Sequence, residues 1–141
     1  INEIIDNYNL KDYVHFLGDL DEESLFHAQS HCQMVIINKI DSVQNRYNFA
    51  TKLGEYLALG KPIITSKIGE VQDYLNHDQS CLFVDPSDSD DIALAIEKLL
   101  DNPDMALHIG MCGRQVAQNS FDYKIYESAL STFFNQLPKR I

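Results

Sequence analysis

Short apolar runs and helically spaced apolar residues alternate along this chain. Four runs are strand candidates, and they occupy residues 13–17, 33–37, 63–65 and 81–84. Helical patterns lie between or after them, at residues 21–31, 51–59, 71–75 and 92–100. Nearly unbroken apolar runs are typical of parallel strands covered on both faces, and their alternation with helices favours a doubly wound sheet. We therefore predict an α/β fold with a doubly wound parallel sheet, in which the strand after Gly60 lies near the middle.

Both ends of the chain have helical patterns. Four apolar residues of the opening stretch fall on one helical face, namely Ile1, Ile4, Ile5 and Tyr8. Because the sequence opens inside this pattern and without Met, we expect a fragment cut inside or just before a helix. Residues 103–118 and 123–137 form two further helical patterns with no strand candidate between them.

Capping and breaking residues predict where the elements begin and end. Thr51 is the predicted N-cap of a helix that stops at Gly60, since Thr hydroxyls cap first-turn amides and Gly followed by Lys-Pro ends helices. Asp88 and Asp91 resemble a capping box for the helix at 92–100. The polar stretch Asn38 to Phe49 is predicted to be a long loop at the carboxyl end of a strand, where open α/β sheets bind ligands.

The strand, loop and helix between Met34 and Leu59 form a candidate anion site. First-turn amides have no partners inside their helix and point outward with the positive end of the dipole. Glu55 lies one turn in, where its carboxylate would accept hydrogen bonds from ribose hydroxyls beside a phosphate at the helix start. A first-turn acid also complements the dipole, so a purely structural role for Glu55 stays open.

Three cations, Lys39, Arg46 and Lys52, flank this candidate site in an otherwise acidic chain. Eleven basic and 21 acidic residues give a net charge of −10, which repels nucleic acids and anionic membrane surfaces. Nucleic acid is therefore excluded as an expected partner. A single nucleotide is not, because one phosphate needs only local amides and one or two cations. For each of the three cations, the alternative interpretation is that it lies in a solvated loop without a ligand.

The length of 141 residues fits one domain with a real core. Cys32, Cys81 and Cys112 are odd in number and lack Cys-x-x-Cys spacing, so we expect buried thiols in a reducing cytoplasm. No apolar run approaches the roughly 18 residues of a membrane helix, and no transmembrane segment is predicted. The five histidines show no metal-ligand spacing, and we predict no metal site.

Several stretches together closely resemble the C-terminal domain of group 1 retaining glycosyltransferases of the two-Rossmann-domain (GT-B) fold. The most specific stretch runs from Phe49 to Pro62, and the others are residues 14–18, 21–25, 45–48, 68–75 and 81–86. The resemblance covers essentially the whole chain. It implies that residues 1–141 are a partial, Rossmann-like donor-binding domain, truncated at its N-terminal side.

The resemblance also implies roles for individual residues. The family carries two glutamates separated by seven residues, of which the second holds the ribose of the nucleotide sugar, and Glu55 matches this second position. Tyr47 stands where the first glutamate is expected to face the transferred sugar. The amides of Phe49, Ala50 and Thr51 would lie near the diphosphate or sugar, and we add Lys52 and Arg46 to the donor-binding residues. No catalytic residue is assigned.

The expected function follows from the same resemblance. The parent protein would transfer a sugar from a nucleotide-diphosphate donor, without another cofactor, to a glycan or lipid-linked acceptor held by a missing N-terminal domain. It would act in polysaccharide biosynthesis, in the cytoplasm or peripherally at the inner membrane, and this fragment alone would be inactive. An epimerase of related fold and a non-catalytic nucleotide-binding or assembly module remain alternatives, because Tyr47 replaces the glutamate.

A further expectation concerns the last helix, which in this family crosses toward the N-terminal domain. Its apolar stripe should be less buried than its pattern requires, and the residues concerned are Tyr126, Leu130, Phe133 and Phe134.

Overall fold

A three-stranded parallel sheet forms the centre of the computed structural model, which describes residues 1–48 and 51–137. Its strands are β1 (Val35–Ile37), β2 (Ile63–Ser66) and β3 (Leu82–Val84), in the spatial order β1-β2-β3. Both pairings are parallel, and the strand after the helix stop lies in the middle. The predicted α/β class and parallel sheet are therefore confirmed.

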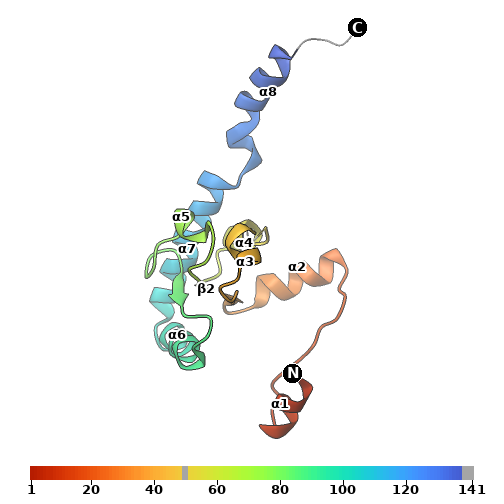
Figure 1. Ribbon diagram of the computed structural model, residues 1–141, viewed down its shortest axis with the longest axis vertical. Coiled ribbons are helices and arrows are strands. Elements are labelled where there is room, and N and C mark those ends of the chain that lie inside the picture. The colour runs from red at the N-terminus through yellow and green to blue at the C-terminus, as the bar shows by residue number, and fades with distance from the viewer. Residues whose placement is uncertain (49–50, 138–141) are drawn as a thin grey trace.

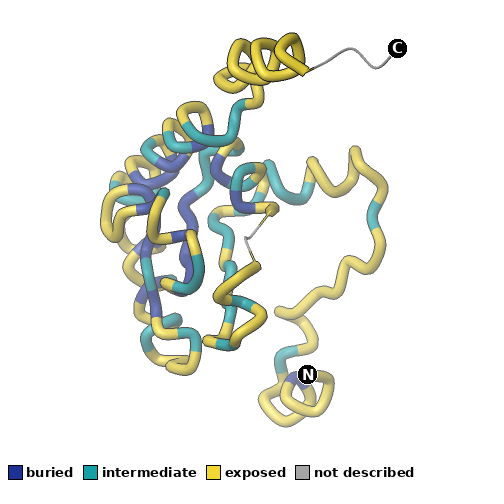
Figure 2. The backbone as a smooth tube through the Cα atoms, turned by 45° about the horizontal axis from the view of Figure 1, so that its top comes forward, coloured by how far each residue is buried: buried dark blue, intermediate teal, exposed yellow. Residues whose placement is uncertain are grey.

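Helices cover both faces of this sheet. They are α4 (Leu53–Ala58), α5 (Val71–Tyr74), α6 (Ser89–Asp101) and α7 (Pro103–Ser120). Consecutive strand residues point to opposite faces, so Ile63 joins the core cluster with α4 and α5, whereas Ile64 joins the cluster with α6. Helix α7 contributes to both clusters through Ala117 and Ile109. Figure 2 shows the buried residues concentrated in this part of the chain.

Only the beginning of the N-terminal segment, up to about residue 20, stands away from the sheet, and the rest leads back to β1 (Figure 1). The segment contains α1 (Asn2–Asn7) and α2 (Glu22–His31), and the Asp21 carboxylate caps α2 by accepting a hydrogen bond from the Ser24 amide at 2.7 Å. The predicted strand at residues 13–17 is wrong. Within the described residues this stretch has no ladder partner, and a parallel strand without a neighbour cannot satisfy its backbone groups.

The predicted loop after β1 contains a short helix, α3 (Val43–Tyr47). The Ser42 hydroxyl caps it by accepting a hydrogen bond from the Asn45 amide at 3.1 Å. Thr51 is not the N-cap of α4, which was the prediction. Lys52 takes that position with helical backbone angles and without a side-chain cap. Gly60 ends this helix region as expected, with a φ of +70°.

The predicted capping box of α6 forms only in part. The Asp88 carboxylate accepts hydrogen bonds from the Asp90 and Asp91 amides, as a cap should. The Asp91 carboxylate does not return to Asp88 but accepts a hydrogen bond from the Asp85 amide at 2.7 Å. The two aspartates thus tie the start of α6 to the chain leaving β3.

The last part of the chain projects away from the sheet as a 3₁₀ turn, η1 (Tyr123–Tyr126), and α8 (Glu127–Gln136) (Figure 1). The prediction of an incompletely buried stripe is confirmed, since Tyr126, Leu130, Phe133 and Phe134 are between 50% and 63% exposed. Across the part of the chain that the structure describes, no helix combines the length and apolar character needed to span a membrane.

Candidate functional site

A hollow of about 340 Å³ lies where β1 ends and α4 begins. Its lining includes the polar residues Lys39, Asn48, Thr51, Lys52 and Tyr56, and the ammonium group of Lys39 donates a hydrogen bond to the Asn48 carbonyl at 3.4 Å. No carboxylate lines this hollow among the described residues, and none of them forms an ion pair with either lysine. Two cations therefore face a space that an anionic group could enter.

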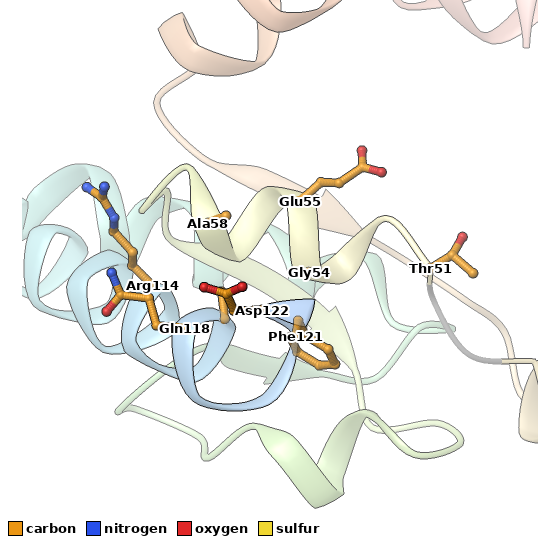
Figure 3. A pocket seen from close by; sticks show the side chains of 9 residues that line it. Thr51, Gly54, Glu55, Ala58, Arg114, Gln118, Phe121 and Asp122 are labelled. Carbon is orange, nitrogen blue, oxygen red and sulfur yellow. The ribbon is translucent and has the colours of Figure 1, made fainter. Parts of the chain in front are cut away.

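Glu55 lies on a different side of α4. It is exposed in the first turn of α4, and it lines two larger hollows of about 570 and 1000 Å³. The first is bordered by Arg114, Gln118 and Asp122 of the α7 end, and Figure 3 shows Glu55 projecting outward from α4, away from these three side chains. Thr51 lines both this hollow and the hollow of Lys39 and Lys52, which we call the lysine hollow. It therefore connects the two sides of the helix start.

Arg46 does not join the two lysines. Its guanidinium donates two hydrogen bonds to the Asp41 carboxylate, at 2.5 Å from Nε and 2.6 Å from Nη2. The hydrogen bond lowers the pKa of Asp41 and raises the pKa of Arg46. Arg46 faces a separate hollow of about 520 Å³, which it shares with Lys67 and Asp85 beyond the ends of β2 and β3. Phe49 and Ala50, the remaining predicted site residues, lie outside the described residues.

Sequence reasoning missed two hydroxyl residues at the end of β2. The buried Thr65 hydroxyl donates to the Ile37 carbonyl at 3.1 Å, and the Ser66 hydroxyl donates to the Lys39 carbonyl at 2.8 Å and accepts from the Lys39 amide at 3.1 Å. The sequence contained a signal for them, because a hydroxyl in a buried strand needs a hydrogen-bond partner. These bonds connect the centre of the sheet to the chain that carries Lys39.

None of the described residues forms a cluster of three or more metal-ligating side chains. The thiols of Cys32 and Cys112 are partly exposed, whereas Cys81 is buried. Burial, and secondarily the charge of Asp78, raises the pKa of Cys81 to about 12.

Alkylation with iodoacetamide at pH 8 is therefore expected to modify Cys32 and Cys112 in the folded protein and to spare Cys81, because only an accessible thiolate reacts. Peptide mapping by mass spectrometry would measure the three sites separately. Modification of all three in denaturant is the control, and equal rates at Cys81 and Cys32 in the folded protein would contradict the buried position of Cys81, the residue before β3.

Comparison with known proteins relates this arrangement to a family. Residues 1–116 match the family described as glycosyl transferases group 1. The chain is 25% identical over 138 residues to MMP alpha-(1->4)-mannosyltransferase from Mycolicibacterium hassiacum, covering 92% of this chain and 32% of that protein.

Two solved structures have similar folds. Sucrose-phosphate synthase from Thermosynechococcus elongatus matches with a TM-score of 0.82 and 27% identity over 96% of this chain and 33% of the other. The Anabaena protein HepE in complex with UDP-glucose matches with a TM-score of 0.82 and 18% identity over 96% and 36% of the two chains. The chain thus spans about a third of the length of each of these relatives. Because the match covers more than half of its residues, the chain belongs to the glycosyl transferases group 1 family, as its motifs implied.

Proposed function

We propose that the complete protein is a retaining glycosyltransferase that moves a sugar from a nucleotide-diphosphate donor to a glycan or lipid-linked acceptor. Residues 1–141 would form part of its C-terminal, donor-binding domain. The observation that carries this proposal is the family match over residues 1–116, which includes the segment of Lys39, Lys52 and Glu55. The fold similarity to HepE in its UDP-glucose complex supports a nucleotide sugar as the donor.

The side chains around the start of α4 have chemistry suited to such a donor. Lys39 and Lys52 would stabilise the diphosphate as negative charge develops on it during bond cleavage. Helix α4 has six residues, so its ends lie only about 9 Å apart and their opposite partial charges partly cancel. The lysines would therefore supply most of the positive potential. Glu55, on the other side of Thr51, would accept hydrogen bonds from ribose hydroxyls.

Tyr47 supports a second candidate function. It is 89% exposed and occupies the position at which the family resemblance implies a glutamate that faces the transferred sugar. A protein that binds a nucleotide sugar without that carboxylate would also fit an epimerase, which needs no acceptor.

Incubation of the complete protein with UDP-, GDP- and ADP-sugars, with and without glycan and lipid-linked acceptors, tests the proposal. Glycosylated acceptor with the expected retained anomeric configuration supports it. An epimerised donor in the absence of acceptor supports the second candidate. Failure to bind UDP, GDP or ADP in calorimetry would contradict both.

Lys52→Met in the complete protein is expected to raise the Kd for UDP by up to about fivefold, since an exposed ion pair contributes about 0.2–1 kcal/mol. UDP is the first probe because HepE was solved with UDP-glucose. Lys61→Met is the matched control, because Lys61 follows the opposite end of α4. The measurement is titration calorimetry at low salt. Equal Kd values for the two variants would remove Lys52 from the donor site.

A further inference from the structure

We propose that Ser66 and Gly69 are positioning residues for the donor site. They would fix the segment 38–48, and through it the lysine hollow at the start of α4, although neither residue lines that hollow. The inference rests on the proposed function for its link to nucleotide binding. The claim that Ser66 and Gly69 fix the segment 38–48 depends only on the contacts of these two residues.

Ser66 holds the beginning of the segment. The parallel register pairs Ile37 with Thr65, and β1 ends at Ile37. Beyond that point the Ser66 hydroxyl continues the pairing in place of the backbone, because it bonds both the amide and the carbonyl of Lys39, at 3.1 and 2.8 Å. Ser66 is only 3% exposed, so water has little access to replace these bonds if the hydroxyl is removed.

Gly69 holds the end of the segment. Its φ is +66°, and a Cβ at this position would lie 3.1 Å from the Asn45 carbonyl oxygen and 3.2 Å from that of Arg46. The backbone of α3 therefore rests directly against the bare Cα of Gly69. Any side chain here would push α3 outward in addition to straining the left-handed backbone.

Both contacts affect residues that line the lysine hollow. Lys39 is held through its backbone by Ser66, and its ammonium group reaches the carbonyl of Asn48, the residue that follows α3. The position of Asn48 in turn depends on α3 and so on Gly69. A shift at either contact would change the distance between Lys39 and the start of α4, and with it the fit of a diphosphate.

Ser66→Ala, compared with Ser80→Ala in the complete protein, tests this inference. Ser80 is a matched control because it is 4% exposed and its hydroxyl also bonds one residue's backbone, accepting from the Asn76 amide at 2.9 Å. It precedes β3 and so lies at the opposite edge of the sheet. Three quantities are measured: the Tm, the Kd for UDP by calorimetry, and hydrogen exchange of the amides at 38–48.

We expect both variants to lower the Tm. Only Ser66→Ala should raise the Kd for UDP, by about tenfold, and accelerate exchange at 38–48. A purely structural role would give the same Kd and the same exchange for both variants, and this result would overturn the inference. If the natural protein binds none of UDP, GDP and ADP, the proposed function fails. Exchange at 38–48 then decides whether Ser66 positions the segment.

Gly69→Ala provides a second variant if Ser66→Ala does not fold. Gly60→Ala is its control, since Gly60 has a similar φ of +70° but its Cβ would meet other atoms only at ordinary distances of 3.7 Å or more. Both substitutions strain the backbone, whereas only Gly69→Ala displaces α3. A higher Kd for UDP and faster exchange at 38–48 in Gly69→Ala alone would support the inference, and equal values in both variants would overturn it.

Discussion

Glu55→Gln in the complete protein is expected to weaken binding of the donor nucleotide tenfold to a hundredfold while leaving the Tm nearly unchanged. Hydrogen bonds from ribose hydroxyls to a carboxylate contribute about 1.5–3 kcal/mol, and about 1.4 kcal/mol corresponds to a factor of ten in affinity. The carboxylate of Glu55 is exposed and accepts no hydrogen bond from any residue in the described ranges. Its replacement therefore removes no internal bond. Titration calorimetry with UDP and thermal unfolding measure the two quantities.

Glu97→Gln is the matched control for this substitution. Glu97 is also an exposed helical glutamate, but it lies on α6 and lines none of the hollows described above. The control should leave both nucleotide affinity and Tm as they are. A lower Tm with unchanged affinity in Glu55→Gln would instead mean that Glu55 only complements the dipole of α4.

Gly110→Ala is expected to cause the largest loss of stability among single methyl additions, about 3 kcal/mol or more. A Cβ at position 110 would lie 2.1 Å from the carbonyl oxygen and 3.0 Å from the carbonyl carbon of Gly60. Both are backbone atoms at the end of α4, so no side-chain rotation relieves the overlap, and α7 must move away from α4. Denaturant unfolding of the complete protein measures the loss.

Gly113→Ala is the comparison for this prediction. Its Cβ would lie 2.8 Å from Cδ2 of Leu57, the far end of a flexible side chain, and 3.4 Å from the Ser80 carbonyl oxygen. Leu57 can shift, so the loss should be clearly smaller than for Gly110→Ala. If the two variants are equally stable, the close approach of α7 to α4 at Gly60 is incorrect.

The strands and longer helices of this fold were predictable because burial produces their patterns directly. Ile63 and Ile64 are both fully buried on opposite faces of β2, and a short run of this kind is typical of a strand covered on both sides. The stretch at 13–17 is equally apolar, yet apolar composition cannot reveal whether a neighbouring strand is present to pair with it. Helix α3 was missed because five residues are too few to show the helical repeat of apolar positions. Only Ser42, as a possible N-cap, indicated it.

The places of the candidate site residues along the helix were predictable from the sequence, but the directions of their side chains were not. Spacing correctly put Lys52 and Glu55 at the start of one helix. It could not show that they face different hollows, because this depends on how Leu53 and Leu57 orient α4 against the sheet. The pairing of Arg46 with Asp41 depended on α3 and was missed with it. The role of each predicted donor-binding residue stays a prediction for the experiments above.

The packing of α7 on α4 has a consequence for synthesis of the protein on the ribosome. Leu53 and Leu57 are translated before the part of α7 that covers them, around Gly113 and Ala117, which follows only after β2, β3 and α6. Until then the nascent chain exposes a strand and a helix whose apolar faces have no cover, a state in which chaperone binding or aggregation competes with folding. Slow codons or pauses between β3 and α7 would therefore prolong the vulnerable interval, whereas pauses after α7 would not.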